Sequence, residues 1–428
     1  MQGEIIAIGN ELTSGRIANT TSTFGAHHLF TAGYEISAMH TIGDDPALIG
    51  KLLKRAISRV DFVLVTGGLG STDDDLTTEA VASALDRPTI PNLELLAKIR
   101  NHLDTIAAQP MSPLEKLAWL PQGAEALTLQ SRMSGYQLIH NNKPIFFLPG
   151  VPSQMETLLL EQVLPRLAIW NHGRHLTTWQ RIYKTFGLAE AEINRRVAKL
   201  ALPKDLQIGY YPVFPDVHLS LTVRVPMDDN PGSTAPHPLA SFEAACRAIE
   251  NCLGDVIYGS DNDSMAAVTG HLLQAANLRL AVAESCTGGM LAQMMTSVSG
   301  SSRYFLGGVI AYANSMKIEY LNVSERLLAS HGAVSQEVAE AMVAGILERS
   351  HADIAIAVTG IAGPDGGTIE KPVGTVYISM AIKKDSRKPQ NPQTIQTRLF
   401  HFTGNRQQIQ TITAQTSLDF IRKYLLSI

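Results

Sequence analysis

The last third of the chain holds hydroxyl, phenol and amine side chains of the kinds that carry out nucleophilic hydrolysis. A serine oxygen attacks a carbonyl carbon when a neighbouring base removes its proton, and a lysine with a lowered pKa is one such base. The residues of these kinds are Ser285, Thr287, Ser302, Tyr312 and Lys317. Which of them meet depends on the strands and helices that position them.

Residues 284–289 form the first of these segments, between a predicted strand at residues 278–283 and a helical pattern that begins at Met290. Free N–H groups at the start of a helix, together with its dipole, bind anions, so this turn is expected to hold a phosphate. Ser285 and Thr287 also suit N-caps, the commonest role of serine and threonine at such a position. The two roles are compatible.

Two further loops supply the second serine and the amine. Ser302 follows Gly300, where a glycine helix stop followed by turn hydroxyls is the simpler interpretation. Asn314 or Ser315 could cap the helix that contains Lys317, which places this lysine in the first helical turn. There the dipole opposes an ammonium, so a desolvated lysine is expected to have a lowered pKa and to act as a general base. The alternative is an ordinary surface lysine.

A glycine-rich loop, residues 359–367, follows a predicted strand at residues 352–358. Glycines at this density let the backbone approach a ligand closely. The alternative is a hairpin-like connecting loop, but a loop of this length between two buried strands is costly in entropy without a function. Thr359 and Gly360 are therefore candidate ligand contacts. Arg406, near the start of the last predicted helix, is a candidate phosphate contact.

The first part of the chain alternates predicted strands and helices, which indicates a parallel sheet that binds ligands at the carboxyl ends of its strands. Glu11 follows one of these strands, and a loop with Gly68 and Gly70 follows another. Asp74 and Asp75 stand directly before a helix. They could bind a divalent cation, or they could be a solvated helix start that the dipole favours.

Composition limits the class of protein. The chain has 428 residues, a net charge of −4 and 45% hydrophobic residues, which indicates two or three globular domains and disfavours nucleic acid as a ligand. It shows no apolar run that suggests a membrane span, no signal-peptide pattern and no metal-ligand spacing among its three cysteines. We expect a cytoplasmic protein with no membrane partner. The α/β pattern predicts domains at residues 1–168, 169–259 and 260–428, the middle one a small α+β module suited to spacing or dimerisation.

Six motifs of the last domain resemble the C-terminal domain of the CinA family. They are residues 284–289 (ESCTGG), 300–302 (GSS), the spaced set Tyr312, Asn314 and Lys317, and residues 331–335 (HGAVS), 360–367 (GIAGPDGG) and 371–375 (KPVGT). The resemblance implies an amidohydrolase that converts nicotinamide mononucleotide to nicotinate mononucleotide and ammonia and needs no cofactor.

The same resemblance implies a role for each matching residue. Ser302 is the reactive hydroxyl, Lys317 is the base and Tyr312 assists, while Ser285 is the alternative nucleophile. The residues implied to bind the nucleotide are Thr287, Gly288, Thr359, Gly360 and Arg406, with Ser285 beside them.

The first domain resembles the molybdopterin-binding fold, and the middle module takes the place of a KH-like domain, as in two-module CinA proteins. This resemblance implies a homodimer and a metal-dependent ADP-ribose pyrophosphatase in the first domain. Three residues depart from the pattern: Asn10 replaces an aspartate, Ser71 a proline and Asp73 a basic residue. These changes alter metal and phosphate contacts, which disfavours pyrophosphatase as the main activity. The middle module lacks a Gly-x-x-Gly loop with basic neighbours, so RNA binding is not expected.

Three functions therefore remain to be compared. The first is a nucleotide amidohydrolase in the last domain, acting on a small-molecule substrate. The second is a divalent-metal-dependent pyrophosphatase in the first domain, alone or as a second activity. The third is a non-catalytic scaffold, which the combination of Ser302, Tyr312 and Lys317 disfavours.

Overall fold

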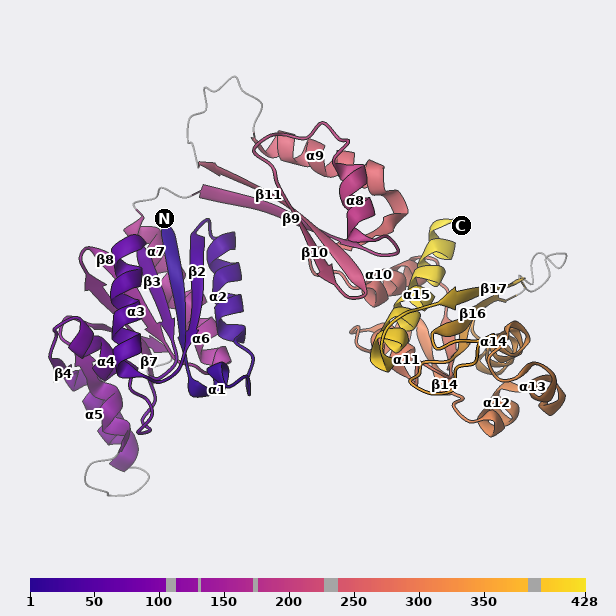
Figure 1. Ribbon diagram of the computed structural model, residues 1–428, viewed down its shortest axis with the longest axis horizontal. Coiled ribbons are helices and arrows are strands. Elements are labelled where there is room, and N and C mark those ends of the chain that lie inside the picture. The colour runs from indigo at the N-terminus through magenta and orange to yellow at the C-terminus, as the bar shows by residue number, and fades with distance from the viewer. Residues whose placement is uncertain (105–112, 130–131, 172–175, 227–237, 384–393) are drawn as a thin grey trace. The chain divides into compact units, whose positions relative to one another are not determined.

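A computed structural model of the protein describes residues 1–104, 113–129, 132–171, 176–226, 238–383 and 394–428. The chain divides into two compact units, Met1–Gln180 with Thr222–Leu239, and Arg181–Leu221 with Ala240–Ile428. Figure 1 shows the helices and strands of each unit. The α/β fold class predicted from the sequence is confirmed.

The first unit is built on a six-stranded sheet of order β2-β1-β3-β8-β7-β6. Its strands are β1 (Gln2–Ile8), β2 (Glu35–Ile42), β3 (Phe62–Thr66), β6 (Glu125–Leu129), β7 (Arg132–His140) and β8 (Lys143–Leu148). The predicted parallel arrangement holds for β2, β1, β3 and β8, whereas β7 pairs antiparallel with both β8 and β6. A separate two-stranded sheet joins β4 (Thr89–Pro91) to β5 (Trp119–Pro121).

Helices cover both faces of this sheet because its central strands are apolar on both sides. The helical elements are α1 (Asn10–Thr13), α2 (Thr20–Thr31), α3 (Pro46–Arg59), α4 (Thr77–Ala84), α5 (Leu93–Asp104), η1 (Pro113–Ala118), α6 (Pro152–Leu158), the π-helical η2 (Leu159–Val163) and α7 (Leu164–Trp170). In β3, Val63 and Val65 pack in one core with α3 and α4, while Phe62 and Leu64 pack in another with α2 and α6. The glycine-containing loop that follows β3 lies at the carboxyl edge of the sheet.

The middle segment contributes a four-stranded sheet of order β10-β11-β9-β12. Its elements are β9 (Leu176–Thr185), α8 (Glu190–Val197), β10 (Gln207–Val213), β11 (Asp216–Pro226), α9 (Pro238–Leu253), η3 (Gly254–Val256) and β12 (Ile257–Ser260). The sequence predicted α8, β10, β11 and α9 but did not reveal β9 or β12.

The last part of the chain forms a five-stranded sheet of order β14-β13-β15-β16-β17. Its strands are β13 (Leu280–Glu284), β14 (Phe305–Ile310), β15 (Ile354–Gly360), β16 (Thr375–Ile382) and β17 (Thr394–His401). Its helical elements are α10 (Met265–Ala275), α11 (Met290–Thr296), η4 (Ser301–Arg303), α12 (Asn314–Leu321), α13 (Glu325–His331), α14 (Gln336–Ser350) and α15 (Arg406–Leu426). Strand β13 runs parallel to β14 and β15, and β16 and β17 extend the sheet antiparallel.

Side-chain size distinguishes the two faces of this second sheet. Ala281 and Ala283 of β13 pack in the core that contains α14, whereas Val282 packs in the core that contains α10, α11 and α15. Figure 1 shows α14 and α15 on opposite sides of the strands. Because β13, β14 and β15 are parallel, the segments that follow them meet at one edge. In the described residues, no helix is both long and apolar enough to cross a membrane.

Candidate functional site

A cavity of about 200 Å³ opens where β13, β14 and β15 end. It is lined by Ser285, Cys286, Tyr312, Asn314, Lys317, Ala333, Val334, Thr359, Gly360, Ala362 and Arg406. Six of the residues predicted to form the site are therefore together: Ser285, Tyr312, Lys317, Thr359, Gly360 and Arg406.

Lys317 is the central residue of this cavity. Only 1% of its side-chain surface is exposed, so it is not an ordinary surface lysine. Its Nζ lies 3.1 Å from the Ser285 Oγ, 2.8 Å from the carbonyl oxygen of Ala311 and 3.2 Å from that of Tyr312. The amine thus has one hydroxyl neighbour and two backbone acceptors.

Burial lowers the pKa of Lys317 from its ordinary value of 10.5, and the negative charge that Cys286 would carry as a thiolate opposes this shift. A neutral amine has two N–H donors and one lone pair. The carbonyls of Ala311 and Tyr312 can only accept hydrogen bonds, so they take the two N–H groups. A charged amine donates its third N–H to the Ser285 Oγ, whereas a neutral amine would offer its lone pair to the Ser285 hydroxyl.

The helix that carries Lys317 begins differently from the prediction. Its N-cap is Ala313, with no side-chain cap, and Asn314 is its first helical residue. The predicted cap at Asn314 or Ser315 is therefore wrong. Asn314 instead lines the cavity beside the amine.

Glu284, at the end of β13, occupies the start of α11. Its carboxylate accepts hydrogen bonds from the N–H groups of Gly289, Leu291 and Ala292, at 3.0, 3.0 and 2.8 Å. The anion site predicted at this helix start is therefore already filled by the protein. The alternative role of Ser285 and Thr287 as side-chain caps is also wrong, because Gly289 is the N-cap and no serine or threonine hydroxyl caps the helix. Ser285 is consequently free to contact Lys317.

Arg406 forms the cationic wall of the cavity. Its guanidinium donates to the carbonyl oxygen of Gly363 at 2.7 Å and to the Tyr312 phenol oxygen at 2.9 Å. Asn405 caps α15 through a capping box, so Arg406 projects from a well-ordered helix start. The prediction of Arg406 as an anion contact fits this position, since a guanidinium has further N–H donors to offer a phosphate.

Two hydrogen bonds hold the remaining wall of the cavity. The Thr359 hydroxyl donates to the carbonyl oxygen of Ala333 at 2.7 Å, and the Lys371 amine donates to that of Val334 at 2.7 Å. Thr359 therefore fixes the loop that carries Ala333 and Val334, and its hydroxyl hydrogen is already used. Gly360 lies against Val376, so a larger residue there would collide with β16.

Ser302 lies at the opposite end of the sheet within one chain. It is an exposed residue of η4, which precedes β14, whereas Ser285 follows β13. The pairing of Leu280 with Phe305 and of Glu284 with Ile310 places the two serines beyond opposite ends of these strands. At about 3.3 Å per residue, this separation is roughly 16 Å or more. The structure therefore does not pair Ser302 with Lys317 in a single chain.

Thr287 and Gly288 are near the cavity in sequence but do not line it. Thr287 is 2% exposed, and its hydroxyl has no hydrogen-bond partner among the described residues. Gly288 has a positive φ of 63°, which a glycine adopts without strain. Their role is to shape the turn, and their direct contact with a nucleotide stays a prediction.

Sequence reasoning missed several residues of the cavity, including Cys286, Ala333 and Val334. Burial raises the pKa of the Cys286 thiol to about 12, so this cysteine is protonated near neutral pH. Glu284 was missed as the partner of α11. An acidic residue at the end of a buried strand, directly before a helix, is the signal that could have identified it.

The predicted N-terminal site gathers at the carboxyl edge of the first sheet. Burial raises the pKa of Asp44, and the charges of Glu11, Asp74 and Asp75 raise it further, while a backbone hydrogen bond from Asn10 lowers it. Glu11, Asp74 and Asp75 are therefore each close enough to Asp44 to affect its charge, and Asp44 is a fourth carboxylate that the sequence did not reveal. Asn10 is bound to it, with its N–H 2.9 Å from the Asp44 oxygen.

Several groups of this N-terminal edge are used inside the loop itself. Asp75 accepts from the N–H of Thr72 at 3.0 Å, and Lys116 donates to the backbone oxygen of Asp75 at 2.6 Å. Gly68 and Gly70 line a cavity of only about 10 Å³ beside Asp75. Within the described residues, no group of three or more His, Cys, Asp or Glu side chains is arranged to hold a metal ion. The role of Asp74 and Asp75 as metal ligands stays a prediction.

Comparison with known proteins assigns a family to all three parts of the chain. Residues 4–169 match a probable molybdopterin binding domain, residues 180–259 the damage-inducible protein CinA KH domain, and residues 262–425 the CinA C-terminal domain. The resemblance seen in the sequence motifs is thereby confirmed.

Individual proteins give the same result. A CinA-like protein of Desulfotalea psychrophila is 58% identical over 426 residues, which cover 100% of this chain and 99% of that protein. A putative competence-damage inducible protein of Moorella thermoacetica is 36% identical, with 99% of each chain covered. The crystal structure of competence/damage inducible protein CihA from Agrobacterium tumefaciens is 34% identical and covers 38% of this chain and 93% of that chain, with a TM-score of 0.35. The two relatives that match over the whole chain show that it belongs to the CinA family.

Proposed function

We propose that the C-terminal cavity hydrolyses the carboxamide of nicotinamide mononucleotide to give nicotinate mononucleotide and ammonia. The observation that carries this proposal is the contact of the buried Lys317 amine with the Ser285 hydroxyl at 3.1 Å. A buried amine with a lowered pKa beside a serine is a base beside a nucleophile. Arg406 supplies a cation at the same cavity for the substrate's phosphate.

In the first half of the reaction, the lone pair of Lys317 takes the proton of Ser285, and the serine oxygen attacks the carboxamide carbon. The resulting oxyanion needs N–H donors. Cys286 and Thr287 follow the nucleophile directly, and their N–H groups donate no hydrogen bond to another described residue, so they can serve this purpose. The Lys317 ammonium then protonates the nitrogen of this intermediate, the carbon–nitrogen bond breaks and ammonia leaves, so that the acyl group remains as an ester on Ser285.

In the second half, Lys317 removes a proton from water, which attacks the ester carbonyl. The carboxylic acid leaves and the proton returns to the Ser285 oxygen, so both groups recover their starting forms. A neutral base also suits this substrate, because the nicotinamide ring of the nucleotide carries a positive charge that would repel an ammonium.

The test compares the two serines in the same assay. Purified full-length protein is incubated with nicotinamide mononucleotide, and ammonia is measured with a coupled glutamate dehydrogenase reaction. Ser285→Ala is expected to lower the rate by roughly 10³-fold or more, since it removes the nucleophile. Ser302→Ala, which removes an exposed hydroxyl away from the cavity, is expected to keep at least half of the rate.

The opposite pattern would contradict the assignment of Ser285. If Ser302→Ala lost activity while Ser285→Ala kept it, the nucleophile would be Ser302 supplied by a second copy of the chain. Light scattering of the wild type, which tests the predicted homodimer, would then be the companion measurement. If the wild type released no ammonia at all, the amidohydrolase proposal itself would fail.

The pyrophosphatase and the scaffold are the competing functions. Incubation of the same protein with ADP-ribose and Mg²⁺ or Mn²⁺, followed by measurement of AMP, tests the N-terminal domain. We expect this rate to be low, because Asn10 and Asp73 alter the charge of that edge. A protein that gives neither AMP nor ammonia would be better described as a scaffold.

A further inference from the structure

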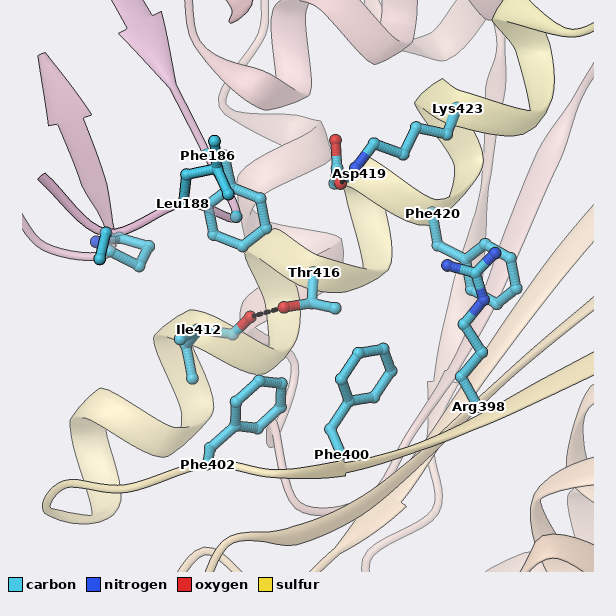
Figure 2. Close-up of a pocket in the computed structure, with 13 residues that line it drawn as sticks. Phe186, Leu188, Arg398, Phe400, Phe402, Ile412, Thr416, Asp419, Phe420 and Lys423 are labelled. Carbon is cyan, nitrogen blue, oxygen red and sulfur yellow. Dashed lines mark hydrogen bonds and ion pairs between the residues drawn. The ribbon is translucent and has the colours of Figure 1, made fainter. Parts of the chain in front are cut away.

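A cavity lined by aromatic side chains lies in the C-terminal unit, away from the proposed catalytic site. It has a volume of about 430 Å³, within the range of small-molecule sites, and shares no lining residue with the catalytic cavity. Its walls come from the loop after β9, from β17 and from α15 (Figure 2). The lining residues are Phe186, Gly187, Leu188, Ala189, Pro215, Arg398, Phe400, Phe402, Ile412, Thr416, Asp419, Phe420 and Lys423.

Phe400 of β17 and Phe402, which directly follows the strand, form a flat wall of this cavity. The rings of Phe400 and Phe402 are nearly parallel, with an interplanar angle of 7° and centroids 5.3 Å apart. Alternate residues of a strand point to the same side, so both rings face α15, as Figure 2 shows. Ile412 lines the helix side, and the Thr416 hydroxyl donates to the Ile412 carbonyl at 2.6 Å, which satisfies the hydroxyl internally. The walls therefore suit a planar, apolar ring.

The rim of the cavity carries excess positive charge. Arg398 lies over the ring of Phe420 at 4.1 Å from its centroid and forms no ion pair with a described carboxylate. Elsewhere on the rim, Lys423 lies 2.9 Å from Asp419 and 3.8 Å from Asp255, and the buried Arg422 pairs with Asp419 at 2.7 Å, so these charges are matched and Arg398 supplies the excess positive charge. A stacked guanidinium keeps its N–H edge free for an anionic oxygen.

From the flat apolar wall and the cationic rim we propose that this cavity binds a small planar aromatic anion, with its ring against Phe400 and Phe402 and its acidic group at Arg398. The middle module supplies Phe186 and Pro215 to the wall, so its role goes beyond the spacing or dimerisation expected from the sequence. Helix α15 connects this site to the catalytic cavity, because it begins at Arg406 and carries Thr416 further along.

The test uses two probes that differ only in charge. 8-Anilinonaphthalene-1-sulfonate carries a sulfonate, and N-phenyl-1-naphthylamine has the same rings without it. Fluorescence titration of the full-length wild type should give tighter binding of the sulfonate. Arg398→Gln should weaken the sulfonate about tenfold and leave the neutral probe within twofold, because only the anion loses a partner. Phe402→Ala should weaken both probes at least fivefold.

Leu399→Ala is the matched control, since Leu399 lies between the two phenylalanines, is 47% exposed and does not line the cavity. It should leave both affinities within twofold. The proposal is overturned if Leu399→Ala weakens the probes as much as Phe402→Ala, or if Arg398→Gln affects both probes equally. A change of oligomeric state in Phe402→Ala by light scattering, with unchanged probe affinity, would identify this face as a contact between copies and would also overturn it. Thermal unfolding of each variant verifies folding, and Arg398→Gln decides the question if Phe402→Ala does not fold.

Discussion

Replacing Lys317 by methionine tests the central assignment of this protein. Methionine keeps a long, flexible apolar side chain in a position that is 1% exposed, so the cavity stays filled. The amine, its lone pair and its three hydrogen bonds to Ser285, Ala311 and Tyr312 are removed. The substitution therefore separates the chemistry of the amine from its volume.

The catalytic effect follows from the loss of the base. General-base catalysis contributes roughly 10²- to 10⁴-fold to a rate. This corresponds to about 3 to 5 kcal/mol in the activation barrier. We expect Lys317→Met to lower kcat for ammonia release by a factor in this range. Lys317→Arg should be equally impaired, because a guanidinium does not lose its proton near neutral pH.

The stability effect has a definite sign. Burial lowers the pKa of Lys317 in the folded state below its ordinary value of 10.5, so between the folded pKa and 10.5 the unfolded chain binds more protons. The free energy of unfolding of the wild type therefore rises with pH in this window, by at most about 1.4 kcal/mol per pH unit. The methionine variant lacks this titration. The free energy of unfolding of the wild type should thus increase relative to that of Lys317→Met as pH rises toward 10.5.

Two measurements check this reasoning. Denaturant unfolding of both proteins across this pH window gives the difference in free energy, in which the two carbonyl groups left without the amine contribute a constant offset. The pH profile of kcat/KM for ammonia release should rise and reach a plateau below pH 10.5 in the wild type. A methionine variant with full activity, or a free-energy difference that does not change with pH, would refute the assignment of a buried neutral lysine.

Three further substitutions address other parts of the site. Arg406→Lys should raise KM for nicotinamide mononucleotide about tenfold with a smaller change in kcat, because the lysine loses the forked contact with phosphate; steady-state kinetics check this. Glu284→Gln should lower the free energy of unfolding by about 2 kcal/mol, because the amide keeps only one, uncharged acceptor oxygen for the N–H groups of α11. Glu325→Gln, on an exposed helix start, should cost less than about 0.5 kcal/mol in the same denaturant titration. Cys286→Ala should retain most activity, and iodoacetamide at neutral pH should not inactivate the wild type, because the raised pKa keeps the thiol protonated.

The sequence predicted well those site residues that lie at the ends of apolar strands. Ser285 and Thr359 each lie at the end of an apolar run, and parallel neighbours bring such ends to one edge. The contact of Lys317 with Ser285 depends on a third strand, β14, which the sequence did not reveal. The antiparallel pairs of β6 with β7 were missed as well, since their polar and apolar residues do not form a continuous apolar run.

The placement of Ser302 shows why motif membership does not determine proximity. Strand β14 contains Gly307 and Gly308, which weaken the pattern of a strand, so the direction of the chain through this segment could not be read from the residues. Without that strand, Ser302 could be expected beside Lys317. Because β14 runs between them, Ser302 precedes this strand at one end of the sheet and Lys317 follows it at the other end.

The start of α11 is a second place where the sequence could not decide whether a serine caps a helix or takes part in catalysis. A serine near a helix start is most often a cap, and no propensity rule decides otherwise. Here a charged carboxylate competes for the same N–H groups, and hydrogen bonds to a charged acceptor contribute about 1.5–3 kcal/mol against about 1 kcal/mol for a neutral one. Glu284 therefore takes the helix start, and the hydroxyl of Ser285 is left to the amine of Lys317. The availability of the proposed nucleophile thus depends on a residue that takes no part in the proposed chemistry, which is why Glu284→Gln is expected to affect both stability and the rate of ammonia release.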